Sequence, residues 1–566
     1  MSWRWRFSED APEAVRTLTE SWEQLDDLPG AATLKANALR SVVALPEAAG
    51  RPPLINKRYK LRSLAERLRF VVAPSRAEEE WRALRRLRSG GVSVPAVFAV
   101  GELRSGLFLH RAGLILERVP DTVHLNQWLV EAAPEADLRV TLLRQLGEEL
   151  ANLHGCGARH PDLHAGNVLV QQVVGGAPRL WLIDHHACRF GAPPREERRR
   201  SDLAKLFHSM AGAWTHDDGI ELLRGYRAIA ATWTESALPA VCEELQQRAR
   251  RLESRRLRSR SKRCWLNSTD FAREANGGWR WHRRKVFPAA AVDALRNQPL
   301  AFERLLHAGE APSNRRTRVG IMKLDGLQAD NKEAPQRTSV VVKELVVGGF
   351  LRSLWHAFVP TALEHAWGAA RAFEVRELPT PQSLALLVEG RWLPRRVLLV
   401  TRFVSDGISV REHIDATPAR TTAAQQRQEV DRCAALVRDL HDYGLYHRDL
   451  NPSNILKVGV GADAQFVFVD LDAVRVRAHL SERRRTKNLV QLGASPGAGL
   501  SPADRRRFLW RYDRGEGRYW SRDFIQHLDR CIGDALVATI GKFSRFEQQT
   551  RTRELRELAK LRSRSS

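Results

Sequence analysis

Two short segments of this 566-residue chain carry residues whose types and spacing suit phosphoryl transfer. HPDLHAGN begins at His160 and HRDLNPSN begins at His447, and an apolar run that ends in an aspartate follows each segment. Phosphoryl transfer requires a carboxylate beside the acceptor hydroxyl, oxygen ligands for the metal ions that bridge the phosphates, and a lysine that neutralises phosphate charge. The pattern predicts one such site for each segment, with its parts in the same order.

Each candidate residue has a role that its chemistry predicts. An aspartate on a loop can orient the acceptor and take its proton, and the candidate catalytic residues are Asp162 and Asp449. Carboxylate and amide oxygens suit Mg²⁺, and the candidate metal ligands are Asn167, Asp184, Asn454 and Asp470. A lysine on an early strand can bind phosphates, and an acid on the next helix can hold that lysine; these candidates are Lys57, Glu80 and Lys343.

The similarity of the two segments extends over most of the chain. Three pairs of residues ahead of the segments are 286 positions apart: Lys57 and Lys343, Trp81 and Trp367, Pro95 and Pro381. The offset is 287 within the segments and 286 again behind them, where Asp184 pairs with Asp470 and Arg189 with Arg475. One short match arises easily by chance, but a series in constant register does not. The chain is therefore interpreted as a tandem duplication of one unit of roughly 280 residues.

Both copies have the same predicted order of elements. Short β-rich runs with one lysine come first, and a helix, further strands and a mainly helical remainder follow. Strands early and helices late indicate an α+β fold with two lobes and a cleft between them. We expect two tandem bilobal domains: 1–285 (N-lobe about 30–120, C-lobe about 121–285) and 286–566 (N-lobe about 300–405, C-lobe about 406–566).

The charge of the chain favours an anionic partner. It has 91 Lys and Arg against 66 Asp and Glu, a net charge of +25, which suits nucleic acid, an anionic membrane surface or a phosphorylated substrate. No recognised nucleic-acid motif is present, so we expect no nucleic-acid partner. In the segment 248–263, nine of sixteen residues are Lys or Arg. This segment predicts either a solvated helix face or a patch for anionic lipid or polyanion.

Other features of the whole chain exclude some classes of protein. No stretch approaches the ~18 consecutive apolar residues of a membrane-spanning helix. The N-terminus MSWRWRFSEDAPEAV has no apolar core of the kind that a secretory signal needs. The six cysteines are scattered without a CxxC pair, which indicates a reducing compartment and argues against a structural zinc site.

The motifs resemble the lipopolysaccharide kinase family, which includes kinases of the inner-core sugar 3-deoxy-D-manno-octulosonic acid and of core heptose. These are atypical members of the protein-kinase-like superfamily. The motifs of the first copy are KRY, EEEWRALRRL…GVSVP, HPDLHAGNVL and LIDHHACR, and those of the second are VVVKE, AWGAARAFE…LPTP, HRDLNPSNIL and VDLDAVR. The resemblance implies a kinase-like fold in each copy, ATP and Mg²⁺ as cofactors, and a sugar hydroxyl on a cytoplasmic-leaflet glycolipid as acceptor.

Several positions depart from the family pattern. Neither copy has GxGxxG before its lysine, and the candidate phosphate-covering loops lie near Lys35 and Ser313. Ala366 takes the position that aligns with Glu80. Glu364, two residues earlier, would point elsewhere on a helix. The second copy therefore has no aligned acid for Lys343.

The leading interpretation is an enzyme: a fused pair of lipopolysaccharide-kinase-type domains, of which one or both phosphorylate a core sugar. We expect it in the cytoplasm, peripheral on the inner face of the cell membrane, where an anionic surface would attract it. Three alternatives remain open. They are a protein Ser/Thr kinase, a small-molecule phosphotransferase of the aminoglycoside or choline type, and a scaffold in which one copy is a pseudokinase. The second copy is the candidate pseudokinase, because it lacks the aligned glutamate.

Overall fold

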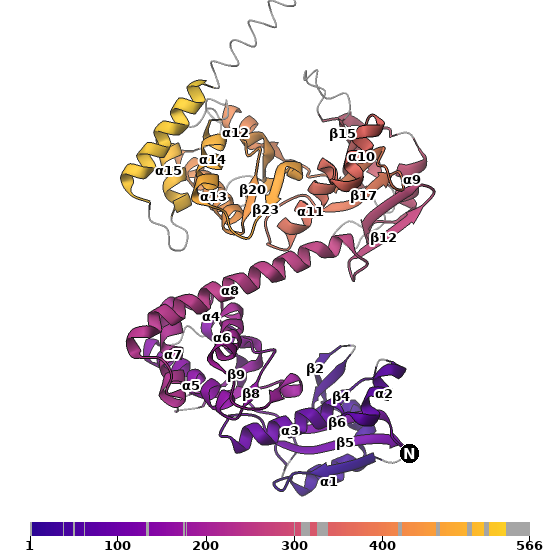
Figure 1. The fold of residues 1–566 in the computed structure, drawn as a ribbon, viewed down its shortest axis with the longest axis vertical. Helices are drawn as coiled ribbons and strands as arrows, with labels where there is room; N and C mark the ends of the chain where they lie inside the picture. The colour runs from indigo at the N-terminus through magenta and orange to yellow at the C-terminus, as the bar shows by residue number, and fades with distance from the viewer. Residues whose placement is uncertain are drawn as a thin grey trace, which may run out of the picture. The chain divides into compact units, whose positions relative to one another are not determined.

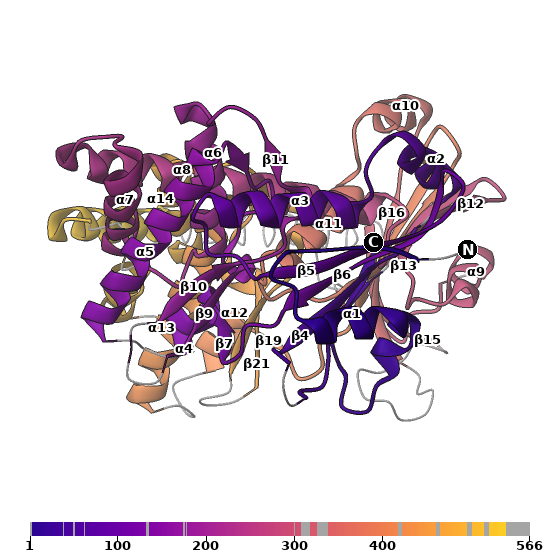
Figure 2. The ribbon, with the colours of Figure 1, turned by 90° about the horizontal axis from the view of Figure 1, so that it is seen from below.

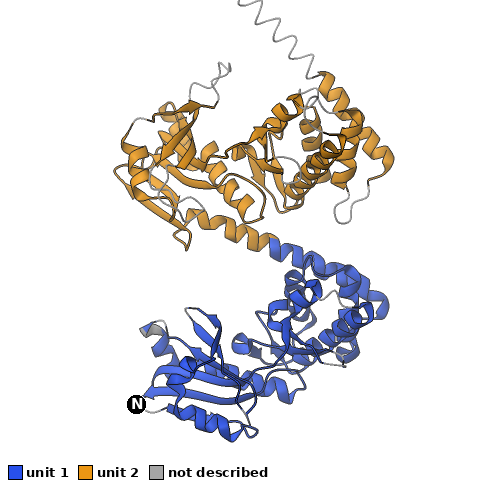
Figure 3. Cartoon of the chain, turned by 180° about the vertical axis from the view of Figure 1, so that it is seen from behind, with its two compact units in different colours: residues 1–253 blue, residues 254–566 orange. Residues whose placement is uncertain are grey.

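The computed structural model has two compact units, Met1–Glu253 and Ser254–Ser566 (Figures 1 and 3). It describes residues 3–37, 39–48, 51–61, 63–131, 135–173, 176, 178–298, 300–306, 317–324, 338–416, 422–459, 464–494, 501–513 and 520–538. In each unit a β-rich N-lobe precedes a mainly helical C-lobe, which confirms the α+β class and the bilobal order. The 24-residue helix α8 (Leu238–Ser261) contains the point at which the units divide.

The N-lobe of the first unit is an antiparallel sheet with Lys57 near its middle. The strand order is β1 (Trp3–Phe7), β5 (Val97–Ser105), β6 (Phe108–Glu117), β4 (Leu54–Tyr59), β3 (Arg40–Ala44) and β2 (Ala32–Ala36). The accompanying helices are α1 (Glu13–Glu20), α2 (Leu64–Val72) and α3 (Arg76–Ser89). On α3 the buried residues Ala77, Glu80 and Leu84 recur at helical spacing. Glu80 therefore shares the apolar face that α3 packs against the lobe.

The N-lobe of the second unit repeats the six strands of this sheet in the same order and adds a further strand, β12, at one edge. Its order is β12 (Phe271–Asn276), β13 (Trp279–Arg284), β17 (Ser383–Glu389), β18 (Arg396–Arg402), β16 (Thr338–Val346), β15 (Thr317–Leu324) and β14 (Arg304–Leu305). Its helices are α9 (Ala289–Asn297), α10 (Phe350–Phe358) and α11 (Ala362–Glu374). Lys343 lies on β16, between β15 and β18, as Lys57 lies on β4 between β3 and β6.

The hairpin β12–β13 places the start of the second unit earlier than the division that we expected at 285 and 286. β13 pairs with β17, so that Trp279 lies opposite Glu389, and β1 pairs with β5, so that Trp3 lies opposite Leu103. Leu103 and Glu389 are 286 positions apart. The two WRW runs are thus corresponding strands, with β1 at the edge of its sheet and β13 covered on its outer side by β12. Their own offset of 276 positions concealed this correspondence in the sequence.

Each C-lobe is built around one long helix with short strands beside it. In the first unit the elements are β7 (Thr122–His124), α4 (Leu125–Glu131), α5 (Ala136–Gly155), β8 (Ala158–Arg159), β9 (Val168–Gln171), β10 (Arg179–Leu182), β11 (Arg189–Phe190), α6 (Glu196–Ser209), α7 (His216–Ala230) and α8. In the second they are β19 (Ile408–Ser409), α12 (Val410–Ala416), α13 (Ala423–Asp442), β20 (Leu445–His447), β21 (Ile455–Val458), β22 (Gln465–Phe468), β23 (Val474–Val476), α14 (Glu482–Gly493), α15 (Pro502–Asp513) and a helix over 522–538.

A buried histidine–tyrosine pair anchors the long helix of each C-lobe just ahead of the HxD loop. His154 Nδ1 lies 2.8 Å from the Tyr226 hydroxyl, and His441 Nδ1 lies 2.7 Å from the Tyr512 hydroxyl. All four rings lie in the core of their lobes. In the second unit Asn488 links this pair to the loop, because its Oδ1 lies 3.2 Å from His441 Nε2 and its Nδ2 donates to the His447 carbonyl at 2.8 Å. The pair therefore fixes where the helix ends and where the loop begins.

The basic segment 248–263 lies on the second half of α8 and the turn that follows it. Arg248 is paired with Glu197 and Glu244, and Arg250 is paired with Glu243. The first arginines of the segment are thus neutralised within the protein. Among the residues that the structure describes, no helix combines the length and the apolar character that crossing a bilayer demands.

The anchor predicts a stability effect for Tyr226→Phe. The substitution removes the hydroxyl that partners the buried His154 nitrogen, and a buried polar group without its partner costs about 1–3 kcal/mol. We expect urea unfolding of Tyr226→Phe to show a loss of that size. Tyr446→Phe, at a half-buried position on β20, is the control and should stay within about 0.5 kcal/mol of the parent protein. Equal stability of the two variants would contradict an anchoring role for the pair.

Candidate active sites in the two units

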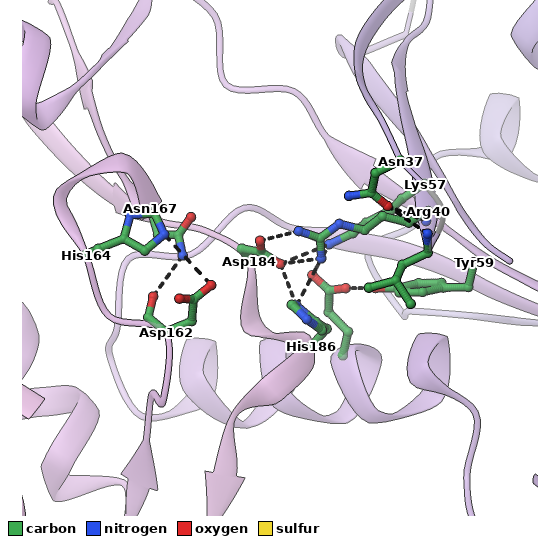
Figure 4. A network of polar contacts seen from close by, with 11 residues as sticks. Asn37, Arg40, Lys57, Tyr59, Asp162, His164, Asn167, Asp184 and His186 are labelled. Carbon is green, nitrogen blue, oxygen red and sulfur yellow. Dashed lines mark hydrogen bonds and ion pairs between the residues drawn. The ribbon is translucent and has the colours of Figure 1, made fainter. Parts of the chain in front are cut away.

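A buried ion pair holds Lys57 in the first unit. Lys57 on β4 is 5% exposed and Glu80 on α3 is 1% exposed, and Lys57 Nζ lies 2.6 Å from Glu80 Oε1. The Tyr59 hydroxyl donates to the other carboxylate oxygen of Glu80. The ammonium also lies 3.7 Å from Asp184 Oδ1, which joins the N-lobe to the C-lobe. Lys57, Glu80 and Asp184 therefore form one cluster between the lobes, and Figure 4 shows Lys57 beside Asp184.

Asp184 is an anion held in a strained backbone position. It follows β10 with φ at 69°, a left-handed conformation that is rare for a residue with a side chain. Burial alone would raise the pKa of its carboxyl. The hydrogen bonds from His186 and Arg40 and the charge of Lys57 outweigh that effect and hold the pKa well below its usual range. Asp184 is consequently ionised at all physiological pH values.

Arg40 is a site residue that the sequence did not single out. It begins β3, and its guanidinium forms a bidentate pair with Asp184, with Nη1 at 2.7 Å from Oδ1. The turn before it is fixed by Asn37 Oδ1, which accepts hydrogen bonds from the amides of Leu39 and Arg40. This β2–β3 hairpin contains the candidate phosphate-covering loop near Lys35. The second candidate loop, near Ser313, lies outside the described residues.

Asp162 and Asn167 lie together on the loop that follows β8. Asn167 is buried, and its Nδ2 donates to the Asp162 carbonyl at 2.9 Å. This bond leaves the amide oxygen of Asn167 as the atom that can ligate a cation. The Asp162 side chain is 59% exposed, so its carboxylate is accessible to an acceptor. Figure 4 shows this pair on one side of Asp184 and the Lys57 cluster on the other.

Two buried neutral histidines, one in this loop and one in the turn at Asp184, pack against each other. The rings of His160 and His185 meet edge to face with centroids 5.3 Å apart. Burial lowers the pKa of His160, and burial together with the nearby His160 lowers the pKa of His185 to about 3. His185 Nε2 lies 2.9 Å from the Leu182 carbonyl. The uncharged pair thus packs like a hydrophobic contact and helps to fix the turn at Asp184.

The second unit holds its lysine differently. Lys343 Nζ pairs directly with Asp470, which has a left-handed φ of 58° like Asp184. Ala366 stands in the apolar cluster where Glu80 stands in the first unit. Glu364 instead forms a capping box with Thr361 and approaches Arg280 at 3.4 Å. Lys343 therefore has no glutamate partner on α11, and its partner is Asp470, which the order of the motifs places opposite it.

The site of the second unit has the same loop bond as the first, but it carries a carboxylate where the first unit has a histidine. Asn454 Nδ2 donates to the Asp449 carbonyl at 2.9 Å, as Asn167 does to Asp162. Asp472 occupies the position of His186, two residues after Asp470. Burial and the charge of Asp470 raise the pKa of Asp472, while Lys343 opposes them. A cation would relieve this repulsion between carboxylates.

Both donor sets fit a magnesium ion. Each unit offers the carboxylate of an aspartate in a left-handed turn and the amide oxygen of the loop asparagine, and Mg²⁺ prefers such hard oxygen ligands. In the first unit both oxygens of Asp184 are engaged by Arg40, so a metal would have to displace that guanidinium. In the second unit Lys343 is the cation that it would meet. The structure thus brings the predicted residues of each copy into one place between its lobes.

Comparison with known proteins identifies the relatives of the chain. The model of the lipopolysaccharide kinase (Kdo/WaaP) family matches residues 57–226 and 337–512. The 3-deoxy-D-manno-octulosonic acid kinase of Vibrio vulnificus is 32% identical over 159 residues, which cover 27% of this chain and 64% of that protein. The lipopolysaccharide core heptose(I) kinase WaaP of Pseudomonas aeruginosa is 28% identical over 157 residues, which cover 26% of this chain and 59% of that protein. The matched part is therefore less than two thirds of either relative.

Among solved structures, WaaP in complex with acyl carrier protein matches at 24% identity with a TM-score of 0.33, over 44% of this chain and 99% of that chain. The two family matches include both lysines, both HxD segments and both strand-terminal aspartates, and together they span more than half of the sequence. The chain belongs to the lipopolysaccharide kinase (Kdo/WaaP) family and carries the family's domain twice.

Proposed function

We propose that the protein is a phosphotransferase that uses ATP and Mg²⁺ to phosphorylate a sugar hydroxyl of the lipopolysaccharide inner core. The observation that carries this proposal is the cluster of Lys57, Glu80 and Asp184 beside the Asp162–Asn167 loop. A kinase needs a lysine held by an acid, a metal-binding aspartate and a catalytic carboxylate in this arrangement. The names of the relatives, which are sugar kinases of the lipopolysaccharide core, support this acceptor class.

In this proposal Asp162 is the catalytic base of the first unit. Its exposed carboxylate orients the acceptor hydroxyl and takes its proton as the phosphoryl group is transferred. The bond from Asn167 to the Asp162 carbonyl keeps the loop in one conformation, so the carboxylate need not be reorganised in the reaction. Asp449 and Asn454 have the same relation in the second unit.

Lys57 and Arg40 are the proposed phosphate ligands of the first unit. Glu80 fixes the Lys57 ammonium toward Asp184. Asp184 and Asn167 would hold Mg²⁺, which neutralises phosphate charge when it is bound. Arg40 would then leave Asp184 and bind phosphate oxygens with the same bidentate fork. This exchange gives the β2–β3 hairpin a phosphate contact without a glycine-rich loop.

The proposed location is the cytoplasm, at the inner face of the cell membrane. The net charge of +25 supports attraction to an anionic glycolipid and to an anionic leaflet. The acceptor is tested by incubating the full chain with labelled ATP and three acceptors: core oligosaccharide, a generic protein substrate and small aminoalcohols. We expect label in the oligosaccharide. Label only in the protein or only in an aminoalcohol would replace the proposed acceptor by one of the alternative kinase types.

Removal of the metal-binding aspartates should abolish metal-dependent nucleotide binding. Asp184→Ala and Asp470→Ala each remove a direct ligand of the cation that neutralises the phosphates. By calorimetry with ATP and Mg²⁺ we expect two sites in the parent protein, one in each single variant and none in the double variant. Unchanged Mg²⁺-dependent ATP affinity in the double variant would refute the kinase proposal. Asp184→Asn, which keeps the shape of the side chain, controls for misfolding.

Arg40→Ala should strengthen the binding of Mg²⁺ and weaken the binding of ATP. Without the guanidinium, Asp184 is free for Mg²⁺, so half-saturation should need less Mg²⁺. The KM for ATP should rise by about ten- to hundredfold, since a charge-assisted pair with phosphate is worth about 1.5–3 kcal/mol. Steady-state kinetics at varied Mg²⁺ and varied ATP measure both effects. Arg111→Ala, at an exposed position on β6, is the control and should change neither.

The two catalytic aspartates should contribute unequally. The first unit has the complete set of site residues, whereas Lys343 in the second has no glutamate partner on α11. We therefore expect Asp162→Asn to lower kcat by orders of magnitude, about 10³-fold, and Asp449→Asn to remove a smaller or separate activity. Melting temperatures should hardly change, because Asn keeps the shape and most hydrogen bonds. Activity lost only in Asp449→Asn would reverse the assignment of the active unit.

A further inference from the structure

Both N-lobes leave large apolar side chains uncovered at the same place. Helices α2 and α10 follow the lysine strands of their units, and their bounds are 286 positions apart. On α10 the exposed side chains are Phe350 (68%), Leu351 (80%), Leu354 (41%), Trp355 (63%) and Phe358 (84%). On α2 they are Leu68 (60%) and Val72 (91%), which align with Leu354 and Phe358. The same exposure thus occurs twice on sequences that have otherwise diverged.

The spacing places these residues on an outward face of each helix. Phe350, Leu354 and Phe358 recur every four residues, which is one side of a helix. An amphipathic helix of a globular protein turns such a face toward the core. On α10 the buried side chain is Ser353, and the apolar side chains face outward, which is the opposite of that rule. Figure 2 shows α2 and α10 each standing outside the sheet of its own unit.

A neighbouring hairpin turn extends each apolar face. In the first unit Arg104 Nη1 donates to the carbonyls of Phe70 on α2 and of Leu107 in the β5–β6 turn, at 3.1 and 2.9 Å. Leu107 (68%) and Phe108 (48%) of that turn are exposed. In the second unit Val347 donates to the Arg395 carbonyl at 2.8 Å, which joins the chain leading to α10 to the β17–β18 turn. That turn exposes Trp392 (75%).

The charges around both faces are positive. Arg352 on α10, Arg391 beside Trp392 and Arg69 on α2 are exposed, and α10 contains no acidic residue. The acid of α2, Glu66, is paired with Arg76. Exposed aromatic and aliphatic side chains with arginines beside them are typical of helices that lie in the interface of an anionic bilayer. Apolar exposure of this extent in a folded domain marks an interaction site.

We propose that α2 and α10, each with its adjoining hairpin turn, dock the N-lobes on the surface of an anionic lipid bilayer. The apolar side chains enter the headgroup region and the arginines contact lipid phosphates. This docking deepens the proposed function, because it would present each site to an acceptor carried by a membrane lipid. Binding to the bilayer nevertheless depends on this surface alone, so it is measured without nucleotide or acceptor.

The test is cosedimentation of the full chain with vesicles, without nucleotide. We expect binding to vesicles of phosphatidylethanolamine and phosphatidylglycerol and weak binding to phosphatidylcholine alone. Leu351→Ser with Phe358→Ser removes two highly exposed side chains and should lower the partition coefficient by about tenfold or more. Leu68→Ser with Val72→Ser tests the first unit in the same way. The matched controls are Val537→Ser and Val130→Ser, at positions that are 71% and 64% exposed elsewhere in the same units.

Three outcomes would overturn the docking proposal. They are absence of vesicle binding by the parent protein, equal binding by the helix variants and their controls, and a change of oligomeric state by ultracentrifugation without any change in vesicle binding. The last would make the face a protein interface. Phosphotransfer to a soluble, delipidated core oligosaccharide distinguishes failure of the docking from failure of the proposed function. The helix variants should retain that activity fully, since their changed residues lie outside the site.

Discussion

Burial of the Lys57 ammonium is the constraint around which the first unit is arranged. A charge that is 5% exposed requires a partner, because a buried charge left alone costs about 3–5 kcal/mol. Glu80 supplies it, and α3 must therefore pack with an acidic residue on its apolar face. Tyr59 satisfies the second carboxylate oxygen. The orientation of α3, and with it the shape of the N-lobe around the site, follows from this one pair.

The second unit shows what happens when the constraint is relaxed. The Lys343 side chain is 21% exposed, so water solvates part of its charge. Ala366 can then belong to an apolar cluster, and the nearby acid Glu364 is free to cap α11. The cost is that Asp470 serves both as lysine partner and as candidate metal ligand. In the first unit Glu80 accepts the short bond from the lysine, which stays 3.7 Å from Asp184, and Arg40 forms the direct pair with that carboxylate.

Much of this arrangement could be predicted from the sequence. The constant offset of 286 or 287 positions identified two copies, and the order of lysine, HxD segment and strand-terminal aspartate predicted which residues meet. Arg40 could not be found in this way. A lone arginine at the start of a strand has no periodicity that reports its target, and its contact with Asp184 joins residues 144 positions apart. The meeting of Lys343 with Asp470 follows from the same order of motifs, and Ala366 accounts for their direct pairing, because it leaves no acid on α11 to compete for the lysine.

The WRW strand escaped detection for a different reason. Its two copies lie at an offset that differs from the rest of the duplication, and only the pairing of β1 with β5 and of β13 with β17 reveals them. Hydrogen-bond register in a sheet depends on spatial neighbours rather than on distance along the chain. A comparison of offsets along the sequence therefore detects the duplication least well where the two units join.

The hairpin β12–β13 also determines how the second unit can be isolated. β13 pairs with β17 over Trp279–Arg283 and so covers the edge of a sheet whose next strands are buried over most of their length. A fragment that begins at residue 286 would expose the N–H and C=O groups of β17, flanked by Leu384 to Val388. Bare apolar edges of this kind template pairing with other chains. Such a fragment should aggregate during expression, whereas one that begins ahead of Phe271 retains its own edge strand and should remain dispersed.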